Sequence, residues 1–138
     1  MVYLDTSALL PLFVRESSSD QVQAALAALA NREPAISDWV LLEFNSAIAA
    51  RVRSGSLDRR EGSEAIRKCE NLTDASFVIC SIVGDDIAAA RVYVEDFPSG
   101  LRAADAVHLA VAHRYSASLL TMDRVQARAA RRLGISVL

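Results

Sequence analysis

The sequence has few of the residues that bind soft metals. It contains two cysteines and two histidines in 138 residues. Cys69 and Cys80 are far apart and form no CxxC pattern, and His108 and His113 lie away from both. This spacing matches no zinc site and no disulfide framework. We therefore expect reduced cysteines, no zinc and a cytoplasmic protein.

Long apolar runs are also missing. No stretch approaches the roughly 18 apolar residues that span a membrane. The apolar N-terminus has no basic flank, Asp5 interrupts it, and Arg15 and Glu16 close it without a small-residue cleavage pattern, so it is unlike a signal peptide. We find no internal repeat or linker, and 52% of the residues are hydrophobic. We expect one domain over residues 1–138, with no membrane contact.

Lysine is nearly absent, and arginine replaces it. Lys68 is the one lysine among 15 basic residues, and the net charge is −2, so the chain as a whole does not indicate nucleic-acid binding. Arginines gather near the C-terminus at Arg124, Arg128, Arg131 and Arg132. Arginine favours bidentate phosphate contacts, but compositional bias and a solvated helix face explain these residues equally well.

Short β-branched or apolar runs alternate with segments of helical length. This alternation is typical of βαβ units with a mainly parallel sheet covered by helices, so we predict the α/β class. The expected strands are "MVYLD" (1–5), "PAISD" (34–38), "ASFVICSI" (75–82), "SLLTMD" (118–123) and "ISVL" (135–138).

The helices between these runs can be recognised from their ends. Gly55 and Gly134 are good stop residues, and Asp58 and Glu61 have the spacing of a capping box. "FPSG" at 97–100 is the clearest turn. The expected helices cover residues 6–14, 17–31, 39–55, 58–72, 84–97, 103–115 and 123–134.

Four acidic residues depart from the apolar pattern of their segments. Asp5 and Asp123 end the first and fourth predicted strands, and ligands of open α/β sheets bind beyond the carboxyl ends of strands. Glu43 and Asp105 lie on apolar or small-residue stripes of predicted helices. Singly, each has a simpler explanation as a helix cap or an exposed acid. Together, we predict, they meet in one crevice.

Such a cluster requires protons or a cation. Two carboxylates ~4 Å apart repel by ~4 kcal/mol at an effective dielectric of 20. A hard divalent metal removes the conflict, and all-oxygen ligation suits Mg²⁺ or Mn²⁺. Mg²⁺ shares its shell with substrate phosphates, which indicates phosphodiester chemistry. Thr6, Ser7 and Thr121 are candidates to orient the acids, and we expect His108 to be a packed structural histidine rather than a general base.

Four stretches of the sequence resemble the PIN-domain ribonucleases, and among them the VapC toxins of VapBC toxin-antitoxin pairs. They occur in the family's order and cover essentially the whole chain. The stretches are "YLDTSALL" (3–10), "ISDWVLLEFNSAI" (36–48), "LRAADAVHLAVA" (101–112) and "LLTMDRVQARAARRLGISVL" (119–138).

The resemblance implies a PIN-like α/β/α sandwich with about five strands and an acidic site formed by Asp5, Glu43, Asp105 and Asp123. Asp5 and Asp105 would be the firmest metal ligands. Thr6 and Thr121 match positions that support the first acid and the last. The implied activity is that of a Mg²⁺-dependent endoribonuclease that cleaves tRNA or rRNA and so stops translation.

The resemblance also implies a VapB-type antitoxin as partner, and commonly a homodimer. The antitoxin's C-terminal segment would lie in a groove near the site. Leu9, Leu12 and Phe13 are candidates for that groove, although core packing explains most of this segment.

Two other classes compete with a nuclease. Receiver domains and haloacid-dehalogenase-like phosphatases also place an aspartate after the first strand. However, the phosphatase expects a second aspartate where this chain has Ser7, and both use a lysine after a later strand, whereas Lys68 lies within a predicted helix. A non-catalytic PIN-like module that binds RNA or protein is the remaining alternative.

Overall fold

The chain forms a four-stranded parallel sheet. The computed structural model describes residues 1–138. Its strands are β1 (Val2–Leu4), β2 (Pro34–Ser37), β3 (Val78–Cys80) and β4 (Ser118–Leu120), in the order β3-β2-β1-β4. All three pairings are parallel. The predicted α/β class with a parallel sheet is confirmed.

The fifth expected strand, residues 135–138, contributes only a single parallel bridge between Leu119 and Val137. Leu119 donates its backbone N–H to Ser136 O at 2.7 Å and accepts from Leu138 N at 2.9 Å. This segment therefore runs beside β4 without extending into a strand, so the sheet has four strands rather than five.

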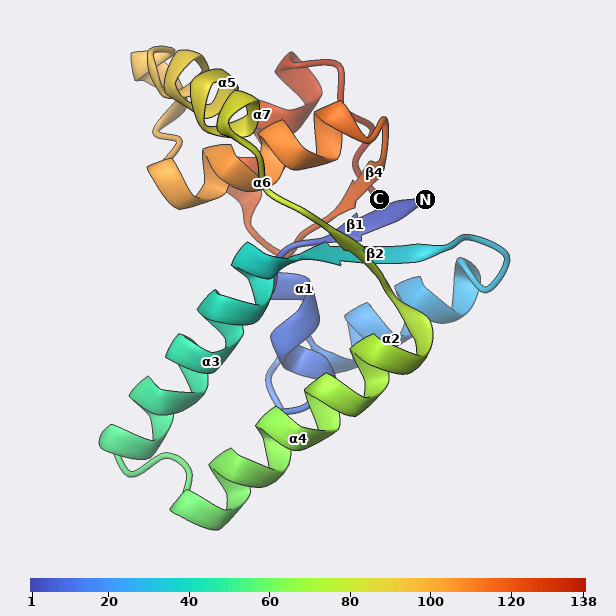
Figure 1. Cartoon of the computed structure of the whole chain (residues 1–138), viewed down its shortest axis with the longest axis vertical. Coiled ribbons are helices and arrows are strands. Elements are labelled where there is room, and N and C mark those ends of the chain that lie inside the picture. Colours follow the sequence, from blue (N-terminus) through green and yellow to red (C-terminus); the bar gives the residue numbers. More distant parts are fainter.

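Helices cover both faces of the sheet and make three layers. Figure 1 shows α1 to α4 on one side and α5 to α7 on the other. The two termini lie near each other, at the amino ends of the strands. No helix is long and apolar enough to cross a membrane. The helices are α1 (Thr6–Leu9), α2 (Ser19–Ala28), α3 (Asp38–Arg53), α4 (Arg59–Ser76), α5 (Gly84–Val94), α6 (Ala103–Arg114) and α7 (Arg124–Arg132), with 3₁₀ turns η1 (Leu10–Leu12) and η2 (Phe97–Ser99).

The helix ends follow the local signals in the sequence. Asp58 and Glu61 form the predicted capping box, each side chain accepting from the other residue's backbone N–H at 2.7 Å. Gly55 and Gly134 follow α3 and α7 with φ of +78° and +77°, the left-handed conformation that glycine adopts without strain.

The helix expected over residues 6–14 is shorter than predicted. α1 ends at Leu9 and continues as the 3₁₀ turn η1, which contains Pro11. Proline has no N–H to donate to the carbonyl four residues earlier, so the α-helical pattern cannot pass it.

The core forms around β1, whose three residues are at most 1% exposed. β1 pairs with β2 on one side and with β4 on the other. From β1 the chain first builds outward through β2 to β3 and later returns to add β4 on the opposite side. The gap between β1 and β4 is therefore the topological switch point, where open α/β sheets form a crevice.

Candidate active site at the carboxyl ends of the strands

All four predicted acids are placed by elements that meet at the carboxyl edge of the sheet. Asp5 directly follows β1, and Asp123 follows β4 and caps α7. Glu43 lies in α3, the helix after β2, and Asp105 lies in the first turn of α6. The topology thus sets Asp5 and Asp123 on the two sides of the switch point.

Asp5 is a buried carboxylate, 3% exposed, and it caps α1 by accepting from Ala8 N at 3.0 Å. Ser7 Oγ donates to its two oxygens at 2.7 and 3.0 Å, and Thr121 Oγ1 donates to Oδ2 at 2.6 Å. Burial raises the pKa of Asp5, and His108 and these hydrogen bonds only partly offset it. The site therefore destabilises the ionised form of this carboxylate.

Thr121 joins the two strands that flank the crevice. Besides Asp5, its hydroxyl lies 2.8 Å from Gln126 Oε1 and accepts from Asp123 N at 3.0 Å. Gln126 is fully buried and donates to the Asp105 backbone carbonyl at 3.3 Å. The sequence analysis did not identify Gln126. A glutamine on the apolar side of the predicted helix 123–134 is the signal that could have revealed it.

Glu43 differs from Asp5, whose two oxygens both accept hydrogen bonds, because both hydrogen bonds of Glu43 involve the same oxygen, Oε2. Thr6 Oγ1 donates to Oε2, and His108 Nε2 lies 2.8 Å from the same atom. Burial raises the pKa of Glu43, but His108, Thr6 and the Trp39 indole outweigh it, so the net pKa is lowered. The Trp39 Nε1 atom is buried and has no hydrogen bond of normal geometry. Glu43 therefore stays ionised at neutral pH.

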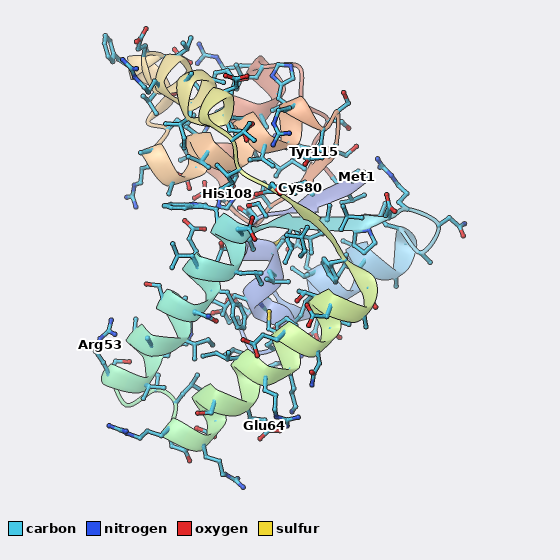
Figure 2. The ribbon with its side chains drawn as sticks, in the orientation of Figure 1. Met1, Arg53, Glu64, Cys80, His108 and Tyr115 are labelled. Carbon is cyan, nitrogen blue, oxygen red and sulfur yellow. The ribbon has the colours of Figure 1, made fainter.

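His108 lies behind Glu43 and is 2% exposed. Figure 2 shows it between α6 and the first turns of α3. Its Nδ1 is 3.0 Å from Tyr3 Oη, which in turn lies 2.7 Å from Ser37 Oγ. The expected packed, hydrogen-bonded histidine is confirmed, and Tyr3 and Ser37 are partners that the sequence analysis missed.

Asp105 and Asp123 lie on the more open side of the site. Burial and the charge of Asp123 raise the pKa of Asp105, and Glu43 adds to the same effect. Asp123 uses Oδ1 to accept from Val125 N at 2.6 Å and Gln126 N at 3.0 Å. Asp123 is thus a helix cap, as the simpler explanation held, and its Oδ2 remains outside the cap.

The side chains of the two supporting threonines bond to acids other than those that the resemblance implied. Thr6 bonds to Glu43 rather than to the first acid, Asp5. Thr121 bonds to Asp5, and it contacts Asp123 only through that residue's backbone N–H. The reason is topological: β1 and β4 are neighbours, so Thr121 faces Asp5, while Thr6 has already turned toward α3.

No basic side chain neutralises three of these acids. None of the ion pairs of the structure involves Asp5, Asp105 or Asp123, and Glu43 pairs with His108. On the other hand, no three His, Cys, Asp or Glu side chains are close enough to form a metal-binding group. The donor set fits a hard cation in its chemistry, but the acids do not form a closed cage.

Residues outside the acidic site fall where the sequence indicated. Lys68 lies within α4 and pairs with Glu64 at 2.6 Å, away from the acids. Arg124, Arg128 and Arg131 are exposed on α7. Arg124 also lines a polar pocket of about 280 Å³ together with Asp123.

The segment after α1 serves mainly as core. Leu9 is fully buried, and the Phe13 ring packs edge-on against Phe44 with centroids 5.4 Å apart. Leu12 lines an apolar pocket of about 430 Å³ at the amino edge of the sheet, beside Val2 and Pro34. Core packing therefore accounts for most of this segment, as expected.

Comparisons with known proteins agree with this fold. A family model described as "PIN domain" matches residues 2–132. A comparison with curated proteins found no match.

Solved structures superpose over almost the whole chain. FitAcB from Neisseria gonorrhoeae has a TM-score of 0.74 at 20% identity, covering 100% of this chain and 96% of that one. VapC20 from Mycobacterium tuberculosis, titled a sarcin-ricin loop cleaving toxin, has a TM-score of 0.73 at 16% identity, covering 94% and 95%. VapBC2 from Rickettsia felis, bound to a promoter DNA fragment, has a TM-score of 0.71 at 17% identity, covering 100% and 98%. At these identities the likeness shows the fold.

Proposed function

Because the chain belongs to the PIN domain family, we propose that it is a divalent-cation-dependent endoribonuclease acting through Asp5, Glu43, Asp105 and Asp123. One observation carries the proposal: elements that meet at the sheet's switch point bring these acids to one edge, and three of them have no basic partner. Burial raises the pKa of Asp5, and burial together with the charge of Asp123 raises the pKa of Asp105. Both ionised carboxylates are therefore destabilised, and a cation would offset this.

The donor set suits Mg²⁺, or Mn²⁺ in its place. Asp5 and Asp105 would hold the ion, and Glu43 and Asp123 would complete the shell directly or through water. Because the acids do not form a closed cage, water and RNA phosphate oxygens would supply the other ligands, as Mg²⁺ prefers. An ion held there would supply the activation of the attacking water and the stabilisation of the leaving oxygen.

The chain's own residues fix the acids in place before any substrate arrives. Ser7 and Thr121 hold the Asp5 carboxylate across the β1–β4 gap. His108 and Thr6 hold Glu43, and the cap of α7 holds Asp123. Such hydrogen bonds orient carboxylates toward a metal and limit their rotation.

The same likeness suggests a biological role. One structural neighbour is titled a toxin that cleaves the sarcin-ricin loop, and another is a VapBC2 assembly. We propose that this chain is a VapC-type toxin, a single PIN domain over residues 1–138 that cleaves tRNA or rRNA, forms a homodimer and is inhibited by a VapB-type antitoxin.

RNA cleavage by the purified protein without its antitoxin tests the activity. Total cellular RNA should be cut at few positions in Mg²⁺ or Mn²⁺ and left intact in EDTA. Asp5→Asn and Asp105→Asn should each lose at least about 100-fold in rate. Asp74→Asn is the matched control, since Asp74 is an exposed acid near the end of α4, just before β3 and so on the amino side of the sheet. Full cleavage in EDTA, or by Asp5→Asn, contradicts the proposal.

A non-catalytic module that binds RNA or protein is the second candidate. It is favoured by the absence of a preformed group of three metal ligands. Calorimetry separates the two functions: a nuclease of the proposed type binds Mn²⁺, and Asp5→Asn weakens that binding. Absence of both metal binding and cleavage would support the module.

A further inference from the structure

A chain of hydrogen bonds leads from the core to Glu43. Ser37 Oγ lies 2.7 Å from Tyr3 Oη, Tyr3 Oη lies 3.0 Å from His108 Nδ1, and His108 Nε2 lies 2.8 Å from Glu43 Oε2. Ser37 and Tyr3 are fully buried, and His108 is 2% exposed. Two neighbouring strands thus connect, through α6, to an acid on α3.

The Glu43 end of this chain fixes the direction of its last bond. Glu43 Oε2 already accepts from Thr6 Oγ1, and as an acceptor on that side it takes the proton of the second contact from His108 Nε2. Tyr3 Oη occupies the opposite side of the ring, at Nδ1. Rotating the imidazole by half a turn would break both contacts at once, and buried polar atoms without partners are costly. Tyr3 therefore holds the ring with its N–H toward Glu43.

The two oxygens of Glu43 differ as a result. Thr6 and His108 both donate to Oε2. No hydrogen bond of normal geometry reaches Oε1. The Trp39 indole, one helical turn earlier, is near enough to the carboxylate to help lower the pKa of Glu43 but makes no such bond. Oε2 thus anchors the carboxylate, and Oε1 is the oxygen left for other ligands.

We propose that Tyr3 and His108 are positioning residues, which anchor Glu43 through Oε2 so that Oε1 is offered to the cation or its water. This inference rests on the proposed nuclease function, and it adds a role for two core residues that touch neither metal nor RNA. Hydrogen-bonded partners of metal ligands typically change metal affinity or activity by about 10- to 100-fold when removed.

The chain contains a matched pair that serves as an internal control. Tyr93 Oη lies 2.8 Å from His113 Nδ1 on the exposed surface of α5 and α6. The atoms and residue types are the same, but no carboxylate is bonded to His113. Tyr93→Phe therefore removes an equivalent hydroxyl without reaching the acids.

The first test compares metal affinity and turnover among variants of the two pairs. Tyr3→Phe should weaken Mn²⁺ binding in calorimetry by about tenfold or more and lower kcat more than it raises KM for RNA, because it disturbs an acid and no RNA contact. Tyr93→Phe should leave both unchanged. Wild-type affinity and kcat in a folded Tyr3→Phe protein would overturn the inference.

Two substitutions at His108 separate positioning from packing. Glutamine places its amide nitrogen near the site of Nε2 and keeps a donor for Glu43, whereas asparagine reaches only to about the site of Nδ1. His108→Gln should therefore retain at least about tenfold more Mn²⁺ affinity and kcat than His108→Asn. Equal losses in the two would show that His108 only fills space, which overturns the inference.

Nitrogen-15 NMR of the metal-free protein gives a readout that does not depend on activity. Wild-type His108 should carry a proton on Nε2 that exchanges slowly with water, and Tyr3→Phe should speed that exchange at least about tenfold while Tyr93→Phe does not. An unprotonated Nε2 in the wild type overturns the inference.

If the wild type itself cleaves no RNA, the nuclease proposal fails; if it cleaves and Tyr3→Phe cleaves equally well, only the positioning role fails.

Discussion

Two tyrosine–histidine pairs, each with its histidine on α6, differ in their surroundings. In each, a tyrosine hydroxyl contacts the Nδ1 of a histidine, at 3.0 Å for Tyr3–His108 and 2.8 Å for Tyr93–His113. The first pair is buried between the central strand and α3, and the histidine continues to Glu43. The second lies nearer the surface, with His113 exposed and Tyr93 half-buried, so water can reach the bond between them.

The difference shows that the same hydrogen bond contributes differently to stability depending on where the fold places it. A hydrogen bond that water can replace contributes little, whereas one that ties together buried groups costs much when broken. Tyr3 lies on the innermost strand and His108 on a helix whose middle is entirely buried. The buried pair therefore supports an acid, and the surface pair has no such partner.

The largest contrast is expected when each histidine is removed. His108→Ala leaves a cavity and strands Tyr3 Oη, so the free energy of unfolding should fall by about 2–4 kcal/mol. His113→Ala should change it by less than about 0.5 kcal/mol. Urea unfolding monitored by circular dichroism measures both, and equal losses would remove the basis of the comparison.

Binding of a divalent metal should affect the buried pair Tyr3–His108 and leave the surface pair Tyr93–His113 unchanged. Mg²⁺ at about 100 times its Kd should raise the free energy of unfolding by about 2.7 kcal/mol. It should also shift the NMR signals of the His108 ring while those of His113 stay in place. Both effects should be lost in Asp5→Asn. A shift at His113 of similar size would mean that the ion binds elsewhere.

Removing each tyrosine hydroxyl should give a smaller contrast. Tyr3→Phe leaves the buried Ser37 Oγ and His108 Nδ1 without that partner and should cost about 1–2 kcal/mol of unfolding free energy. Tyr93→Phe should cost less than about 0.5 kcal/mol. Thermal unfolding in EDTA measures these values, and a neutral Tyr3→Phe would show that water enters behind β1.

The smallest expected change in unfolding free energy is that of Asp105→Asn. Asp105 belongs to the acidic site, and the surface pair has no such acid beside it. Burial and the charge of Asp123 raise the pKa of Asp105, so ionised Asp105 opposes folding. Asp105→Asn in EDTA should raise the free energy of unfolding by less than about 1 kcal/mol at neutral pH.

The pH dependence of that gain follows from the direction of the shift. A raised pKa in the folded state stabilises the wild type below the unfolded value of about 3.9 and is lost as pH rises through the folded value. The advantage of Asp105→Asn should therefore vanish below about pH 4 and be complete at neutral pH. An advantage that grows toward acid would contradict the clustered charges.

Much of the fold follows from local sequence patterns. The strands around Tyr3 and Leu119 are apolar runs too short for helices, and the Asp58–Glu61 box marks the start of α4. The helix over residues 6–14 was predicted too long although Pro11 stands within it, and its missing N–H ends the α-helical pattern. Residues 135–138 were predicted as a full strand, but they form only one bridge, between Val137 and Leu119. The length of a strand depends on its pairing with a neighbouring strand and not on residue preference alone.

The candidate site could be predicted only in part. The four acids stood out because each interrupts an apolar pattern, and their role as ligands stays a prediction. Thr6 and Thr121 were recognised as supporting hydroxyls but given the wrong partners, since the order of strands decides which side chain faces Asp5. Gln126 was missed although its place on the apolar side of the helix was a usable signal. Tyr3 was missed because one hydroxyl in an apolar strand gives no periodic signal.

The sequence by itself determined the α/β class, the helix caps and the identity of the acids, because periodicity and capping act over a few neighbouring residues. Only the tertiary structure decided which groups meet. It set β1 between β2 and β4, so that Thr121 reaches Asp5 and Tyr3 reaches His108. Contacts between residues more than a hundred positions apart depend on strand order and burial, and no local pattern encodes them.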